Sequence, residues 1–307
     1  MKRVVYLRID VDFNIGLKKG VPYLLNLLKE KAIQGSFFVV MGPDTLARHL
    51  PRAKSKLYQK RLSSYNPIKI LRYFGLALIK SRFSGLRVGP DYPEILNRII
   101  KENHDLGVHG FNHAKWADRC YELNSEETKK QMNLAIKTFH ELFPGMDWVW
   151  AAPNWACNRY MFDYLEEKKP RYSSDLRGCE PFYPLINGKK NSVIQFPINL
   201  PCLHELVQFG VPRKKIPSLM VRCLRKNYNL LCIHDYFEGI LDKGLFQEVL
   251  SAISYEGWEI KPLSQAFKDW ENRHSPGDEI STIMLPGGIK KVSCQKQFLV
   301  NNYFSQL

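Results

Sequence analysis

The stretch Leu7-Arg8-Ile9-Asp10-Val11-Asp12 decides both the fold and the chemistry of this chain. It ends the first apolar run, whose β-branched and aliphatic residues 4–10 are typical of a buried strand. Two carboxylates two residues apart at the end of a strand lie on the same face. Asp10 and Asp12 can therefore converge on one cation, or divide between binding a cation and transferring a proton.

Three histidines extend this pattern. His109 and His113 are four residues apart, and His234 ends a later apolar run. Two imidazoles at this spacing can reach one ion if the segment is helical. An aspartate and two histidines leave coordination positions open for water and substrate, as in a catalytic site. The set predicts a metal-dependent hydrolase with the second carboxylate as base, although an isolated HxxxH pair is more often two helix-face residues.

The rest of the chain alternates between strand and helix patterns. Gly20-Val21-Pro22 opens a helix that Gly35 ends, so the first forty residues predict a βαβ unit with parallel pairing. Further strands are expected at 36–41, 106–110, 148–152, 171–175, 192–198, 230–234 and 258–262. This alternation predicts a largely parallel, barrel-like sheet. Sites form at the carboxyl ends of such strands, where we find Asp10, Asp12, His109, Asp175 and His234.

Composition limits the class of protein. The 307 residues, 45 % of them hydrophobic, allow one large α/β domain, which we place at 1–274, followed by a tail at 275–307 that docks on it. Seven cysteines with no CxxC pair argue for a reducing compartment. No apolar run approaches the roughly 20 residues of a spanning helix, and no secretion signal is evident. We therefore expect a cytoplasmic protein.

Most of the net charge of +15 lies between residues 45 and 90, which hold eleven lysines and arginines and no acidic residue. One helix face there would carry Ile70, Leu71, Phe74 and Leu78, with Lys69, Arg72 and Lys80 roughly opposite. Such a basic amphipathic insertion favours an anionic membrane surface, at about 1 kcal/mol per basic residue. A solvated surface helix is the alternative. Nucleic acid also attracts such charge, but no recognised motif supports it as a partner.

The motifs Arg8-Ile-Asp10-Val-Asp12, His109-x-x-x-His113 and Ile233-His234, in this order, resemble the polysaccharide deacetylase (NodB-homology, carbohydrate esterase family 4) superfamily. Within it, the chain is most similar to the branch of deformylases and deacetylases that act on formamido-arabinose or hexosamines carried by polyprenyl phosphate. Supporting stretches lie at 20–25, 42–49, 172–178, 195–201, 233–239 and 293–295. The resemblance therefore covers nearly the whole chain.

The resemblance implies a distorted (β/α)7 barrel in which Asp12, His109 and His113 bind a divalent ion. Asp10 would be the general base and His234 the general acid. Zn²⁺, Mn²⁺, Co²⁺ and Ni²⁺ all suit such ligands. The chemistry agrees, because a bound cation can lower the pKa of water to about 7 and a histidine can protonate the leaving amine.

One departure from the superfamily concerns the base. An Arg-x-Pro-Tyr element commonly stands beside it, whereas the matching segment 150–155, Trp-Ala-Ala-Pro-Asn-Trp, has no arginine. Arg177 could orient Asp10 instead. Asp175 could alternatively orient His234.

We further expect Trp155, Glu238, Lys69 and Arg72 to contact substrate, with packing or solvation as the alternative for each. The implied function is removal of a formyl or acetyl group from an amino sugar on undecaprenyl phosphate, in lipid A modification and resistance to cationic antimicrobial peptides. The protein would lie peripherally on the inner face of the cytoplasmic membrane, with no protein partner. The alternatives are a deacetylase of soluble or cell-wall glycans and an inactive lipid-binding homologue.

Overall fold

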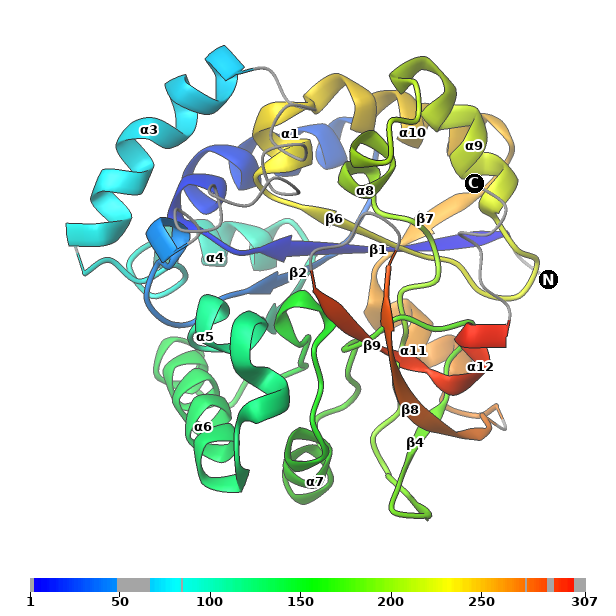
Figure 1. Ribbon diagram of the computed structural model, residues 1–307. Helices are drawn as coiled ribbons and strands as arrows, with labels where there is room; N and C mark the ends of the chain where they lie inside the picture. Colours follow the sequence, from blue (N-terminus) through cyan, green and yellow to red (C-terminus); the bar gives the residue numbers. More distant parts are fainter. Residues whose placement is uncertain (1–2, 49–66, 84, 274, 286–289, 301–307) are drawn as a thin grey trace.

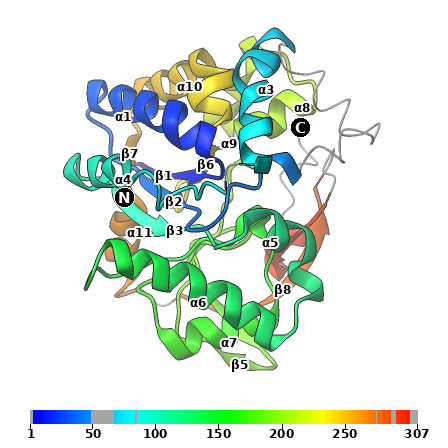
Figure 2. The ribbon, with the colours of Figure 1, turned by 90° about the vertical axis from the view of Figure 1, so that its left-hand side faces the viewer.

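The computed structural model describes residues 3–48, 67–83, 85–273, 275–285 and 290–300 (Figure 1). A parallel sheet forms its centre, with helices above and below it in both views (Figures 1 and 2). Among the described residues, no helix has the length and apolar character needed to span a membrane.

The central strand is β1 (Val4–Val11), which is buried along nearly its whole length. β2 (Ser36–Val39) and then β3 (Asp105–Val108) pair on one side, and β6 (Leu230–His234) pairs on the other. Short β7 (Glu259–Lys261) pairs with the first residues of β1. All these pairings are parallel. The carboxyl ends of β1, β2, β3 and β6 therefore meet at one edge, as predicted.

Beyond β3 the wall continues through single parallel bridges, from Val108 to Trp150, then to Ser173 and then to Gln195. The expected strands at 148–152, 171–175 and 192–198 therefore lie in the right order but are not regular strands. Side chains take over part of the ladder: Ala152 N donates to a carboxylate oxygen of Asp175, at 2.8 Å. The predicted α/β fold, a parallel barrel distorted along this wall, is confirmed.

Helices cover the outside of this wall. On one side lie α1 (Val21–Glu30), α8 (Leu203–Gln208), α9 (Ile216–Cys223) and α10 (Lys243–Tyr255), and on the other α5 (His113–Arg119), α6 (Ser125–Leu142) and α7 (Arg159–Lys168) (Figures 1 and 2). α4 (Pro93–Lys101) and α11 (Leu263–Trp270) complete the set around the sheet. Asn124 caps the start of α6, because its side chain accepts from Glu127 N at 2.9 Å. Each of these helices contributes buried apolar residues to the core.

The segments that follow β1 and β6 press together at the carboxyl edge. After β1 the chain forms a wide turn, η1 (Gly16–Gly20), before α1 begins, and after β6 it forms a similar turn, η6 (Phe237–Leu241). A Cβ atom on Gly20 would lie 2.1 Å from the carbonyl oxygen of Asp235. Only glycine permits this approach, which fixes both segments beside the strand ends.

The basic insertion contains α3 (Pro67–Phe83); residues 49–66 lie outside the described chain. Ile70 and Phe74 pack against the core. Leu71, expected on the same face, is instead 75 % exposed, because the buried stripe of α3 is narrower than the sequence suggested. The outer face combines large apolar residues with exposed basic ones: Ile68, Leu71, Leu76, Ile79 and Phe83 with Arg72, Lys80 and Arg82.

The C-terminal segment forms a small second sheet. β8 (Gly277–Met284) pairs in parallel with β4 (Tyr183–Ile186) and antiparallel with β9 (Lys291–Gln295), while β5 (Lys189–Lys190) pairs with β4. A short helix, α12 (Lys296–Val300), follows β9. Arg177 N donates to Ser293 O at 3.0 Å and Gln295 N donates to Arg177 O at 2.8 Å. This segment is therefore joined to the barrel wall through the backbone.

Candidate metal centre and active site

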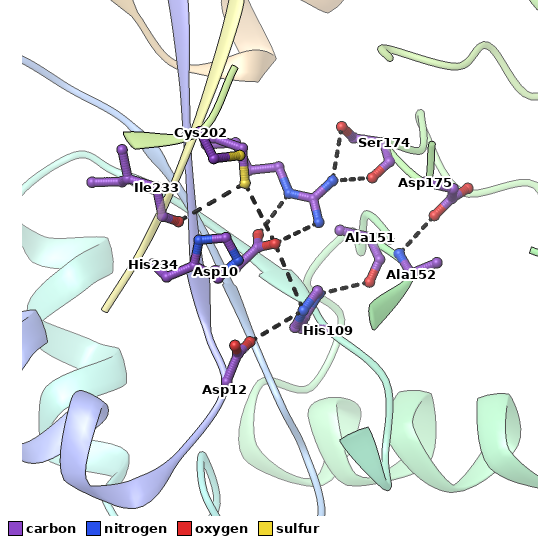
Figure 3. Close-up of polar contacts among 12 residues, drawn as sticks. Asp10, Asp12, His109, Ala151, Ala152, Ser174, Asp175, Cys202, Ile233 and His234 are labelled. Carbon is purple, nitrogen blue, oxygen red and sulfur yellow. Dashed lines mark hydrogen bonds and ion pairs between the residues drawn. The ribbon is translucent and has the colours of Figure 1, made fainter. Parts of the chain in front are cut away.

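Three potential metal ligands meet at the carboxyl edge of the sheet. Asp12 follows β1, His109 follows β3, and His113 is the first residue of α5. Nε2 of each histidine lies 3.4 Å from Oδ1 of Asp12. All three side chains are buried, and their ligand atoms lie within 4.8 Å of one another. Figure 3 shows Asp12 and His109 facing each other across this point.

The chemistry of this group fits a divalent cation. Oδ1 of Asp12 is buried without a hydrogen-bond partner in the described chain. Nδ1 of His109 lies 2.8 Å from the carbonyl oxygen of Ala151, so it donates there and turns the lone pair of Nε2 toward Asp12. Burial lowers the pKa of His113 to about 4 against the opposing effect of Asp12, so His113 is neutral at pH 7, as a ligand must be.

Asp10 is held by Arg8, its neighbour on the same face of β1. Nε of Arg8 donates to Oδ1 at 2.6 Å and Nη2 donates to Oδ2 at 2.8 Å. Burial would raise the pKa of Asp10, but the Arg8 guanidinium and His109 outweigh it and hold the pKa below its usual range. Oδ2 of Asp10 lies 3.7 Å from Nε2 of His109. An ionised carboxylate is thus fixed beside the three potential metal ligands.

The expectation that Arg177 orients Asp10 is wrong. Arg177 is fully buried and pairs with Glu205, with Nη2 2.6 Å from Oε2, and its guanidinium stacks over Trp155 at 4.2 Å. Arg8 orients Asp10 instead. In the sequence, Arg8 was read only as one residue of the buried strand. The contact between Arg8 and Asp10 could have been predicted from the sequence, because residues two apart in a strand lie on the same face.

Asp175, which could have oriented His234, lies in the barrel wall and bonds to other residues of that wall. Its carboxylate accepts hydrogen bonds from Ala152 N, from the hydroxyl of Ser173 and from Nε2 of Gln195, the last at 2.9 Å. Neither Asp10 nor His234 is among its hydrogen-bond partners in the described chain. Burial raises the pKa of Asp175 to about 6 despite these donors. Its geometry supports a structural position that joins the three bridged segments.

His234 pairs in register with Asp10 across β6 and β1. Its ring is surrounded by other rings, with centroids 4.7 Å away for His204, 5.6 Å for Tyr236 and 6.2 Å for Trp155. Burial lowers the pKa of His234, whereas Asp12 and Asp10 oppose that change. His204 comes into this cluster through α8, whose start is held by Glu205, the partner of Arg177.

The residues expected to contact substrate have different surroundings. Glu238 is fully buried and accepts from His234 N at 2.8 Å, so it supports the segment after β6. Trp155 is buried with Nε1 lacking a hydrogen-bond partner in the described chain, and its φ of 48° is in the left-handed region. Such backbone strain gathers at functional sites. Arg72 is exposed on α3, and the side chain of Lys69 lies outside the described structure.

Replacing Glu238 by glutamine tests its protonation. Burial raises the pKa of Glu238 to about 8, from an ordinary value of 4.5. Between these values the folded state keeps a proton that the unfolded state has lost, so stability falls as pH rises. From pH 5 to 8 the wild type should lose roughly 4 kcal/mol more stability than Glu238→Gln. Denaturant unfolding at several pH values measures this difference. The exposed-acid control Glu248→Gln should follow the wild type; parallel curves for wild type and Glu238→Gln would contradict the burial argument.

The chain matches known proteins along most of its length. A family model of polysaccharide deacetylases matches residues 2–172. A Wigglesworthia glossinidia brevipalpis protein named "Probable 4-deoxy-4-formamido-L-arabinose-phosphoundecaprenol deformylase ArnD" is 28 % identical over 93 % of this chain and 100 % of its own length. A Shewanella sediminis protein of the same name is 25 % identical over 92 % of each chain.

Solved structures agree on the fold. A candidate polysaccharide deacetylase from Mycobacterium smegmatis superposes with a TM-score of 0.53 at 15 % identity, covering 88 % of this chain and 94 % of its own. The T48 deacetylase, solved with substrate, gives 0.50 at 13 % identity, covering 87 % and 92 %. Because the family model spans more than half of the sequence, the chain belongs to the polysaccharide deacetylase family and is a hydrolase of amide C–N bonds.

Proposed function

We propose that the protein removes an N-formyl or N-acetyl group from an amino sugar carried on undecaprenyl phosphate. The observation that carries this proposal is that a potential base and a potential metal site lie side by side. The buried carboxylate of Asp10, held by Arg8, lies 3.7 Å from the Asp12–His109–His113 cluster and in register with His234. The lipid-linked substrate is supported by the two relatives, whose names specify such a sugar.

Asp12, His109 and His113 would hold a divalent cation. When bound, it would polarise the amide carbonyl and lower the pKa of a water molecule to about 7. The Asp/His₂ set suits Zn²⁺, Mn²⁺, Co²⁺ and Ni²⁺ alike.

The protein's own residues supply the proton transfers. Asp10 takes a proton as water attacks the carbonyl carbon, and it can do so because Arg8 keeps it ionised. His234 stands on the neighbouring strand and donates a proton to the leaving nitrogen. Glu238 holds the backbone of His234 at 2.8 Å, so that its ring keeps its place against Trp155.

The outer face of α3 supports contact with a membrane. α3 packs near η6 and stands beyond the carboxyl end of β1, on the same side as the site (Figure 1). It exposes five large apolar side chains, from 59 % for Ile79 to 77 % for Phe83. A helix that only faced water would not gather such a patch. With Arg72, Lys80 and Arg82 beside it, this face suits the interface of an anionic leaflet.

The product amine carries a positive charge at neutral pH. We place the reaction in lipid A modification at the inner face of the cytoplasmic membrane. A more positive lipid A repels cationic peptides, which connects this activity to peptide resistance.

The activity is tested with two substrates, formamido-arabinose-phosphoundecaprenol and N-acetylgalactosamine-phosphoundecaprenol. Incubation with metal-loaded protein should remove the formyl or the acetyl group, and mass spectrometry of the lipid reports which. Asp10→Asn should be at least about 100-fold slower, because it cannot accept the proton. If neither lipid changes mass, the lipid-linked assignment fails and soluble glycans become the substrates to test.

Arg8→Lys tests the positioning of the base. Lysine keeps the charge but not the two-pronged contact, so the carboxylate loses its orientation. We expect kcat/KM to fall about 10- to 100-fold with unchanged metal content, since small misplacements are costly in catalysis. Arg213→Lys, at a half-exposed ion pair, is the matched control and should retain its rate. Equal rates for Arg8→Lys and wild type would refute the assignment.

Vesicle flotation tests the role of α3. Exchanging Arg72, Lys80 and Arg82 for glutamate should weaken binding to anionic vesicles by at least roughly 100-fold, at about 1 kcal/mol for each basic residue. The control exchanges Lys129, Lys137 and Lys168, which lie on α6 and α7 across the molecule, and should bind like wild type. Unchanged flotation of the α3 variant would remove the membrane role of this helix.

A further inference from the structure

A second group of potential metal ligands lies beside the first. Asp10, Cys232 and His234 place their ligand atoms within 4.8 Å of one another, and all three are buried. Sγ of Cys232 lies 3.5 Å from Oδ2 of Asp10. The pairing of β1 with β6 causes this, because Arg8 stands opposite Cys232 and Asp10 opposite His234 on adjacent parallel strands. Figure 3 shows Asp10 and His234 side by side at this point.

An independent observation also indicates a missing ligand. Nδ1 of His234 is buried, and no hydrogen bond reaches it from any residue that the structure describes. A buried imidazole nitrogen normally has a partner. This nitrogen could bind a cation through its lone pair or, when protonated, donate a hydrogen bond. The side chain is 8 % exposed, which limits what bulk water can offer.

The donor atoms of this group differ from those of the first. Thiolate, imidazole and carboxylate together are zinc ligands, and the thiolate disfavours Mn²⁺ and Mg²⁺, which prefer oxygen. The Asp12–His109–His113 cluster has no sulfur and is less selective. The two groups should therefore respond differently to different cations.

Charge decides the order in which the groups fill. Arg8 contacts the carboxylate of Asp10 and opposes a cation there, with Nη2 only 2.8 Å from Oδ2. Binding must also release the thiol proton of Cys232. Once that proton leaves, Asp10 and Cys232 supply two negative charges against the two positive charges of the ion. The second group therefore binds more weakly and fills only above one equivalent of metal.

We propose that Asp10, Cys232 and His234 form a second, inhibitory zinc site. This inference rests on the proposed function, because occupation of the site removes both the base and the acid of that reaction. General acid–base catalysis contributes about 10²- to 10⁴-fold, so saturation should slow turnover by at least about 100-fold. Zinc would thus act at the first group as a cofactor and at the second as an inhibitor.

A cobalt titration of the metal-free full chain tests the site without any substrate. The first equivalent should give no thiolate-to-cobalt charge-transfer band, since the first group holds no sulfur. A band should grow with the second equivalent, and Cys232→Ser should abolish it. His234→Gln, which leaves the thiol in place, should weaken the second binding step. Cys223→Ser, on α9, is the matched control and should keep the band.

An activity assay forms the second arm. For each protein, the rate in excess Zn²⁺ is compared with the rate at one equivalent. Excess Zn²⁺ should slow the wild type at least about 100-fold and should leave the rate of Cys232→Ser nearly unchanged. Excess Mn²⁺ should not inhibit. Absence of the band at the second equivalent, its persistence in Cys232→Ser, or equal zinc inhibition of both proteins would overturn the proposal. If the lipid-linked sugars are not hydrolysed at all, the proposed function fails. The cobalt charge-transfer band still shows whether the second metal site exists, because that measurement needs no substrate.

Discussion

The buried pairing of Arg8 with Asp10 is the constraint on which the active site depends. A lone carboxylate with 2 % exposure would take up a proton, because burial penalises its charged form. The two-pronged contact with a guanidinium, itself fully buried, keeps Asp10 ionised and fixes its plane. Removing one partner of such a pair leaves an uncompensated charge in the core. The pair therefore links the proposed base to the integrity of the central strand.

The sequence predicted much of this site for reasons that are local and geometric. Parallel strands must end at one edge, so Asp10, Asp12, His109 and His234 converge as their places in the pattern required. The pairing of Arg8 with Asp10 was missed because a basic residue inside an apolar run was counted as part of the strand. Its partner was two positions away on the same face, and alternation alone would have identified it.

Other features could not be derived from local patterns. Segments 148–152, 171–175 and 192–198 have strand-like composition, but their hydrogen bonds go partly to the side chains of Asp175 and Gln195, which are distant in sequence. The burial of Glu238 depends on how η1 and η6 press together. Periodicity grouped Leu71 on one face of α3 with Ile70 and Phe74, whereas the width of the buried stripe depends on what packs against the helix. Tertiary context decides each of these cases.

The backbone bonds between Arg177 and β9 have a consequence for biogenesis. The chain is made from its N-terminus, and residues 291–295 emerge long after all the proposed metal ligands and proton-transfer groups. Until then Arg177 lacks the partners for its main-chain amide and carbonyl, and the wall that carries Trp155 and the Arg177–Glu205 pair is open on that side. We therefore expect the wall beside the candidate site to reach its final geometry only after this late segment has been made.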